Sequence, residues 1–177
     1  AVSNVYLSQD DIQPGDLRWA ILSESAFAIP RDYLLTLNIE AVSDAAYLSD
    51  YDYSSQDRLE SSVAFSRTRE RSDTLFELVG VRSFREREGD GTLPAIIFDA
   101  SHTALFTPGA LGGTAAVDLS FHSHYRESNS RDDENGDGLA DGLDLSRASA
   151  RLDWQRSWTL AMGVIADAHS QVGADAY

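Results

Sequence analysis

The connections between the predicted strands alternate between short and long, and this alternation constrains the fold more than any motif. Eight stretches have the length and residue content of strands: 17–29, 33–42, 58–70, 74–85, 94–105, 113–125, 143–154 and 158–169. Every second connection is short, at 30–32, 71–73, 106–112 and 155–157, whereas the polar segments 43–57, 86–93 and 126–142 are longer. Alternate connections of an up-and-down antiparallel sheet lie at opposite ends of its strands. We therefore expect one rim of tight turns and one of long acidic loops, as in an outer-membrane β-barrel wall.

Side chains alternate along several of these stretches, as expected for strands with one apolar face. In 33–42 the apolar set is Tyr33, Leu35, Leu37, Ile39 and Ala41, and polar residues lie between them. Ala150, Leu152 and Trp154 form a similar set, and Trp158, Leu160, Met162 and Val164 would continue it after the turn. The stretches span about 10–13 residues, against the ~5–6 typical of soluble sheets. That length suffices for a tilted strand to cross a bilayer, so we expect these apolar faces to contact lipid.

Aromatic residues lie near the predicted strand ends. Trp154 and Trp158 flank the predicted turn 155–157, and the others are Trp19, Tyr33, Tyr47, Tyr51 and Tyr53. Amphipathic rings at strand ends are typical of a membrane interface. The alternative is that these rings cap the core of a soluble β-sandwich.

Composition excludes several classes of function. The chain has 177 residues, a formal net charge of −15, a sequence pI near 4.4 and no cysteine. Nucleic-acid binding requires a basic surface that neutralises phosphates, so this acidic chain argues against it. The lack of cysteine excludes disulfides and thiolate-bound metals. The length fits a single domain or a piece of one.

A barrel protein must be exported, so its precursor requires a signal peptide at the amino terminus. No apolar run approaches the ~18 residues of a membrane-spanning helix. Ala1 opens on polar residues, without the pattern of a signal peptide. We therefore expect residues 1–177 to be one β-barrel segment that has been processed or excised from a longer protein.

One stretch has a distinctive order of motifs. Residues 33–59 read YLLTLNIEAVSDAAYLSDYDYSSQDRL, in which an alternating strand leads into VSD, then YL and Y, and DRL opens the next strand. Further pieces follow in order: TLP at 92–94, LGG at 111–113, and Trp154 with WTL at 158–160. This ordered set resembles the barrel domain of the LPS-assembly protein family (LptD, also called organic-solvent-tolerance protein).

The resemblance implies a function and partners. It implies an all-β, antiparallel up-and-down meander that is a segment of a large barrel in the bacterial cell outer membrane. Such a barrel inserts lipopolysaccharide into the outer leaflet, with an LptE-like lipoprotein plug and outer-membrane lipid as partners, and it is not an enzyme. The periplasmic jelly-roll domain of the family has no counterpart in residues 1–177.

The long acidic loop contains the oxygen-ligand spacing of a calcium loop. The candidate ligands are Asp133, Asn135, Asp137, Leu139, Asp141 and Asp144, and Gly138 stands at position 6, where an EF-type loop turns sharply. No helix pattern flanks the loop, and position 12 is Asp instead of the usual Glu. A solvated acidic loop tip is the interpretation that we favour, with calcium binding as the alternative. If the loop binds calcium, we expect weak affinity, in the ~10⁻⁴–10⁻³ M range of extracellular modules.

Two other clusters have a chemical and a structural interpretation. Ser120, His122 and His124 share a strand face with Asp118, which suits a metal site or a Ser–His hydrolase, but also a polar wall lining a lumen. The arginines near 67–71 and 82–87 could bind lipid phosphates. Acidic residues are interleaved with them, so surface ion pairing is the prediction that we favour.

Three functions from different classes are therefore compatible with the sequence. The leading one is a segment of the barrel that assembles lipopolysaccharide. The second is a secreted, calcium-stabilised β-sandwich that binds a ligand. The third is a small barrel enzyme acting on lipids.

Overall fold

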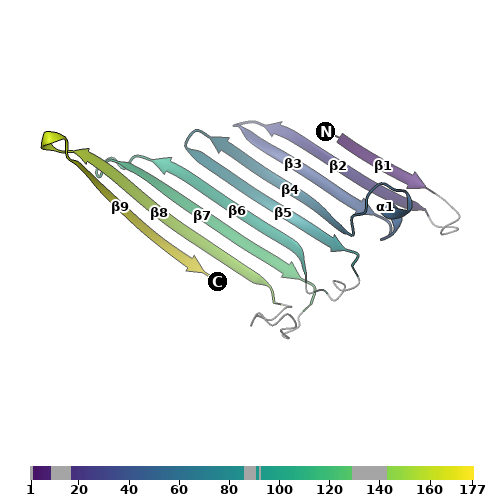
Figure 1. Cartoon of the computed structure of the whole chain (residues 1–177). Coiled ribbons are helices and arrows are strands. Elements are labelled where there is room, and N and C mark those ends of the chain that lie inside the picture. Colours follow the sequence, from purple (N-terminus) through teal and green to yellow (C-terminus); the bar gives the residue numbers. More distant parts are fainter. Residues whose placement is uncertain (1, 9–16, 86–90, 92, 129–142) are drawn as a thin grey trace.

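The computed structural model describes residues 2–8, 17–85, 91, 93–128 and 143–177, and its strands form one open antiparallel sheet (Figure 1). The nine strands follow one another across the sheet in sequence order. They are β1 (Val2–Ser8), β2 (Arg18–Ile29), β3 (Tyr33–Val42), β4 (Arg58–Arg69), β5 (Ser72–Ser83), β6 (Pro94–Phe106), β7 (Thr114–Arg126), β8 (Leu145–Thr159) and β9 (Ile165–Ala176). The predicted all-β meander is confirmed, and the open sheet fits a barrel segment.

Connections of the two kinds lie at opposite ends of the strands (Figure 1). The short-turn rim carries 30–32, 70–71, 107–113 and 160–164. The long-loop rim carries 43–57 and the strand ends Ser83, Pro94, Arg126 and Leu145. The predicted alternation of the rims is therefore confirmed. The long-loop rim also holds the four-residue helix α1 (Tyr47–Asp50). The helices in the described part of the chain are too short and too polar to reach across a bilayer.

The predicted final hairpin is wrong. Residues 155–157 belong to β8, which runs on to Thr159. It pairs with β7 as far as Gln155 and with β9 as far as Thr159. The alternation of Trp154, Arg156 and Trp158 on one side simply continues the strand. The chain reverses later, at Ala161–Gly163 (η2), where Met162 and Gly163 have φ angles of 63° and 79°.

Two further predictions are also wrong because the chain reverses later than expected. The tryptophans of β8 do not flank a turn, and 160–164 is the turn itself and not the start of an apolar strand face. Met162 is 96% exposed there. The short strand β1 was not predicted, because its seven residues are separated from the long stretches and alternate only weakly.

Burial is concentrated at the long-loop rim. Ala20, Val42, Tyr47, Leu48 and Leu59 form the buried hydrophobic cluster of the described residues. Most other strand side chains are only partly buried, as expected for a single-layer sheet with no second layer packed on it. The sheet therefore depends on its surroundings to cover its apolar side chains.

The connection between β6 and β7 generates a test of local packing. Gly113 has a φ of 76°, and a Cβ added there would overlap the carbonyl oxygen of Gln155 on β8. We expect Gly113→Ala to lower the free energy of unfolding by at least about 1–2 kcal/mol, because an L side chain is strained at this φ before the overlap is counted. Urea unfolding of the full-length protein in lipid vesicles would measure it.

Gly109 provides the matched control. It lies in the same connection, and no heavy atom lies within 4 Å of the Cβ position. Gly109→Ala should therefore leave the unfolding midpoint nearly unchanged. Equal midpoints for the two variants would contradict the close approach of β8 to Gly113.

Candidate functional site

The strand register sorts the side chains into two faces. Cross-strand partners lie on the same face, and successive residues of a strand alternate between faces. One row runs from Leu37 on β3 through Val63, Leu78 and Phe98 to Ser123 on β7. We call this side the apolar face. Other members are Val5, Phe27, Leu35, Ile39, Phe65, Phe76, Phe121, Val117, Leu119, Leu152, Trp154 and Val172.

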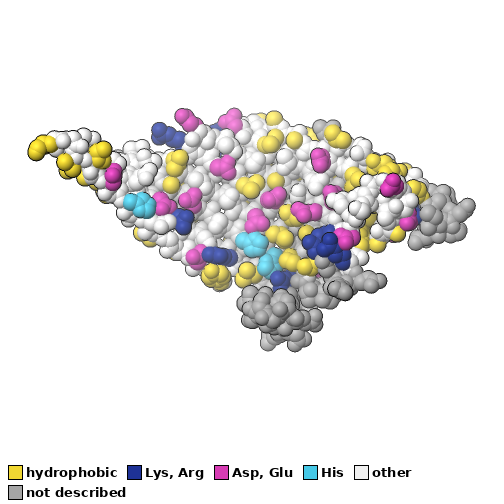
Figure 2. Space-filling view, viewed as in Figure 1, with side chains coloured by type: hydrophobic (Ala, Val, Ile, Leu, Met, Phe, Trp, Pro, Cys, Tyr) yellow, Lys and Arg dark blue, Asp and Glu magenta, His cyan; other side chains and the backbone are white. Residues whose placement is uncertain are grey.

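Every acidic residue of the described strands lies on the opposite side, which we call the polar face. These residues are Glu24, Glu40, Glu60, Asp73, Glu77, Asp99, Asp118, Asp153, Asp167 and Asp175. Figure 2 shows acidic side chains spread across the width of the visible face, together with histidines and arginines. The acidic side chains are therefore confined to one face over the whole sheet.

The apolar face is not covered by another layer in the described part of the chain. Leu119 is 45% exposed and Leu152 is 46% exposed, although both lie in the middle of long strands. In a soluble antiparallel sheet the apolar face packs on a core and the polar face meets water. An uncovered apolar face of this size instead suits contact with lipid chains.

Hydrogen bonds between strands line the polar face. His122 Nδ1 lies 2.7 Å from a carboxylate oxygen of Asp99, and its Nε2 lies 3.2 Å from His124 Nδ1. Thr103 donates to Asp118 across the same pair of strands at 2.8 Å. Between β8 and β9, Arg147 donates to Asp175 at 2.9 Å and Ser149 donates to the same oxygen at 2.5 Å. These half-exposed groups need water around them, so the face suits an aqueous lumen.

The predicted grouping of Ser120, His122, His124 and Asp118 on one face is correct, and their contacts agree with the polar-wall interpretation of this cluster. His122 contacts Asp99 on the neighbouring strand, and Asp118 accepts a hydrogen bond from a threonine. Within the described residues, no three or more His, Asp or Glu side chains are arranged to hold a metal. The arrangement is a polar wall.

Most of the predicted calcium loop lies outside the described residues: Asp133, Asn135, Asp137, Leu139 and Asp141. The sixth candidate, Asp144, accepts a hydrogen bond from the backbone N–H of Arg126 at 2.8 Å. Calcium binding stays a prediction.

The predicted ion pairing of the arginine clusters is present at two places. Arg69 pairs with Asp32 at 3.0 Å, and Arg85 pairs with Asp57 at 2.7 Å. The hydrogen bond from Arg85 lowers the pKa of the Asp57 carboxyl below its usual value. Both pairs are about half-exposed, so each contributes little to stability.

The β3–β4 loop is attached to the polar face by a buried arginine. Arg18 is 1% exposed and donates to both carboxylate oxygens of Asp44 at 2.8 and 2.9 Å. It also donates to Asp50 of α1 at 2.8 Å. Ala20 and Val42 lie on the polar face beside Arg18. Tyr47 of the loop belongs to the same buried cluster as these two residues. The loop therefore folds back over the polar face at the long-loop rim.

Tyrosines gather around this loop. Tyr6 of β1 lies 4.2 Å from Tyr53 between ring centroids, and Tyr47 lies 4.9 Å from Tyr51. The expectation that Tyr47, Tyr51 and Tyr53 are interfacial anchors is therefore wrong for Tyr47, which is buried at 1% exposure. These rings pack on one another because the loop turns inward. Tyr33 does lie on the apolar face near a strand end, as predicted.

Sequence reasoning did not identify Arg18, Asp50 or Asp99 as site residues. Arg18 and its carboxylate partners are 26 and 32 residues apart in the chain, and only the fold-back of the loop joins them. Asp99 and His122 face each other through the β6–β7 register. The nearest clue was the VSD and YL order at 42–48, which contains Asp44 and Tyr47.

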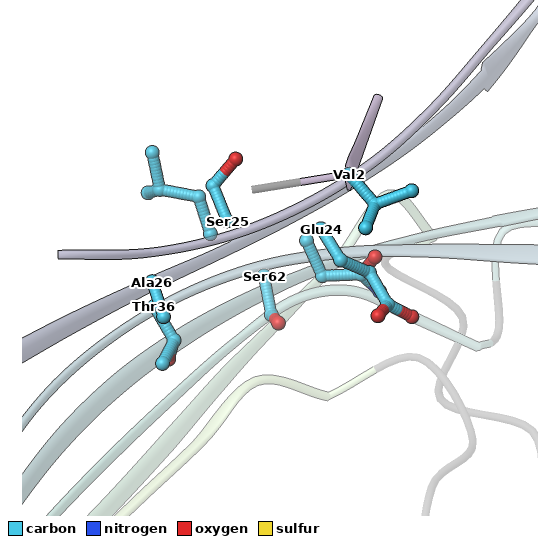
Figure 3. A pocket seen from close by; sticks show the side chains of 8 residues that line it. Val2, Glu24, Ser25, Ala26, Thr36 and Ser62 are labelled. Atoms are coloured by element: carbon cyan, nitrogen blue, oxygen red, sulfur yellow. The ribbon is translucent and has the colours of Figure 1, made fainter. Parts of the chain in front are cut away.

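A shallow hollow over β2–β4 shows the alternation of the faces at close range (Figure 3). Glu24, Thr36 and Ser62 point to one side of the strands, and Ser25 points to the other. The hollow is open to its surroundings and is not the enclosed pocket expected of a small-molecule site.

Leu37 and Thr36 test the assignment of the faces. Leu37→Arg should lower the free energy of unfolding in lipid by about 2–4 kcal/mol, because an arginine near the bilayer midplane is poorly solvated. Thr36→Arg, one residue away on the polar face, is the control and should have a much smaller effect. Refolding of the full-length protein into lipid vesicles would measure both. Equal effects would show that the apolar face does not meet lipid.

Asp44 makes the rim loop sensitive to acid. Hydrogen bonds from Arg18, with a further one from Ser43, lower the pKa of Asp44 to about 2. A lowered carboxyl pKa stabilises the folded loop above the usual carboxyl value near 4, and that contribution is lost as the pH falls through about 2. Pepsin, which is active in this range, should cut the loop near Tyr47 increasingly as the pH is lowered from 4 to 2.

Two variants separate this ion pair from general acid unfolding. Asp44→Asn should be cut already at pH 4, because the charge that holds Arg18 is absent. Asp52→Asn, in the same loop, should follow the wild-type profile. A wild-type profile for Asp44→Asn would show that the ion pair does not hold the loop.

Comparison with known families places the geometry in context. A family model described as "LptD: LPS transport system D" matches residues 16–177, which is nearly the whole chain. No curated protein and no solved structure matches the chain. The matched family is a component of lipopolysaccharide transport and is not an enzyme family. The long, two-faced strands of an open meander agree with this match. The chain therefore belongs to the LptD family, which functions in lipopolysaccharide transport at the outer membrane.

Proposed function

We propose that the nine strands form part of the wall of an outer-membrane barrel that assembles lipopolysaccharide into the outer leaflet. The observation that carries this proposal is the confinement of the acidic side chains to one face of the sheet. All acidic residues of the described strands lie on the polar face, and the uncovered side chains opposite them are mainly aliphatic and aromatic. The apolar face would meet acyl chains, and the polar face would meet the water of a lumen.

The dimensions of the sheet support this role. Strands β2 to β9 have between 10 and 15 residues. A tilted transmembrane strand needs ~9–11 residues. Short turns at one rim and long loops at the other match the periplasmic and outer sides of such barrels. A β-sandwich would need a second sheet, and the described residues form one.

The polar face also suits the substrate. Lipopolysaccharide combines acyl chains with hydrated sugars and phosphates, which cannot pass through hydrocarbon. Hydroxyl, carboxylate and imidazole groups on β6–β9 would keep the sugar region hydrated. An LptE-like lipoprotein plug is the partner that membership of this family suggests, and it would sit against the same polar face.

Single cysteines test the proposal, because the chain contains none of its own. Leu119 and Ser120 are adjacent in β7 but lie on the apolar and polar faces, respectively. In outer membranes containing the full-length protein, a charged maleimide should label Ser120→Cys and leave Leu119→Cys largely unlabelled. Background labelling is subtracted with the unsubstituted protein.

A second reagent makes the test symmetrical. A lipid-soluble maleimide should reverse the preference and label Leu119→Cys. Equal labelling of both positions by the charged reagent would mean that both faces meet water, which would overturn the barrel-wall proposal.

A further inference from the structure

Arginine is unusual on the apolar face, and its positions there are informative. The register places Arg67 and Arg69 of β4, Arg82 of β5 and Arg156 of β8 on this face. All four lie toward strand ends, where an arginine facing lipid is much less unfavourable than at the midplane. Each guanidinium has five N–H donors that must still find acceptors.

Three of these arginines have protein acceptors. Arg69 pairs with Asp32 at 3.0 Å and donates to the carbonyl of Arg31 at 3.1 Å. Arg82 donates to the carbonyl of Val42 at 3.3 Å. Arg156 donates to the carbonyl of Leu111. Their side chains are therefore already committed to holding turns and strand ends.

Arg67 differs from the other three. Its guanidinium carbon lies 4.6 Å from the centroid of the Tyr33 ring, which itself stacks on Phe65 at 4.4 Å. Its Nε is buried, and no hydrogen-bond partner for it is found in the described part of the chain. Among the described residues, no carboxylate forms an ion pair with Arg67. The ring fixes the position of the cation without satisfying its donors.

The nearby charges favour an anion. Arg31, Arg69 and Arg71 lie at the same turns, together with Asp32, Glu70 and Asp73. Asp32 is paired with Arg69, and Asp73 lies on the polar face, where it accepts a hydrogen bond from Thr68 at 2.6 Å. The remaining positive charge sits at the short-turn rim, on the face that meets lipid. This rim lies at the periplasmic side in barrels of this design.

We propose that Arg67, positioned by Tyr33, binds the phosphate of an anionic glycerophospholipid in the inner leaflet. The inference rests on the proposed barrel-wall function, because it requires the apolar face to meet lipid. A phosphate provides the charged acceptors that the guanidinium lacks, in a geometry suited to paired N–H donors. The acyl chains of the same lipid would cover neighbouring side chains such as Phe65 and Phe76.

Native mass spectrometry of the full-length protein, released from detergent micelles with added lipid, tests the site. Phosphatidylglycerol is compared with diacylglycerol, which has the same chains and no phosphate. Arg67→Gln should weaken phosphatidylglycerol binding about fivefold, the factor expected for one basic residue near anionic lipid. Diacylglycerol binding should not change.

Matched variants identify the group responsible. Arg69→Gln, whose parent side chain is paired with Asp32, should bind phosphatidylglycerol like the wild type. Arg67→Lys keeps the charge but lacks the paired N–H donors, so its binding should lie between those of the wild type and Arg67→Gln. An unchanged Arg67→Gln, or an equal loss in Arg69→Gln, would overturn the proposal. Equal losses in Arg67→Lys and Arg67→Gln would assign the effect to packing on Tyr33 and overturn it too.

Two further outcomes separate the sources of failure. Displacement of phosphatidylglycerol by inorganic phosphate at matched ionic strength would show that the site takes any phosphate, and would overturn the assignment to lipid. If the wild-type protein retained neither lipid, the apolar face would not be a lipid-binding surface. That result would reject the barrel-wall function as well, whereas loss of headgroup preference alone would reject only the Arg67 site.

Discussion

Pairing between strands that are neighbours in sequence is the constraint on which the rest of the structure depends. A bilayer core offers no water to an unpaired N–H or C=O group, so a wall in lipid must satisfy its backbone through its own ladders. Each strand of this sheet pairs with the next one in sequence. Because side chains alternate with a period of two, the register of these ladders also decides which groups face which solvent. A one-residue slip in any ladder would exchange the two faces on one side of it.

The carboxylates make such a slip unfavourable. Glu77, Asp99 and His122 occupy one row across β5, β6 and β7. If β6 shifted by one residue, Asp99 would turn to the apolar face and lose its contact with His122. The acidic composition therefore contributes to register as well as to the character of the polar face. An apolar set alone would specify the faces less strongly, because several strands carry small or polar residues on both sides.

The sequence allowed the meander and its two unlike rims to be predicted, because turn residues and strand periodicity are local properties. The alternation at 33–42 is regular enough to define a strand and its apolar face. The β8–β9 hairpin was placed too early because Trp154 and Trp158 resemble a pair bracketing a turn, whereas the reversal depends on the φ angles of Met162 and Gly163. The pairing of Arg18 with Asp44 could not be predicted, since it requires a loop to fold back onto a strand from the preceding hairpin.

The strictly sequential order of the strands has a consequence for how this wall is built and how it changes. Each new strand pairs only with the edge of the strand before it, so assembly can proceed one hairpin at a time. The entropic cost of closing each tight turn is small because the turn is short. Lengthening a loop at the long-loop rim adds only a small entropic cost of loop closure, about 0.6 kcal/mol for each doubling of the loop length. Insertions can therefore accumulate in those loops, and whole hairpins can be gained or lost, while the remaining ladders keep their partners.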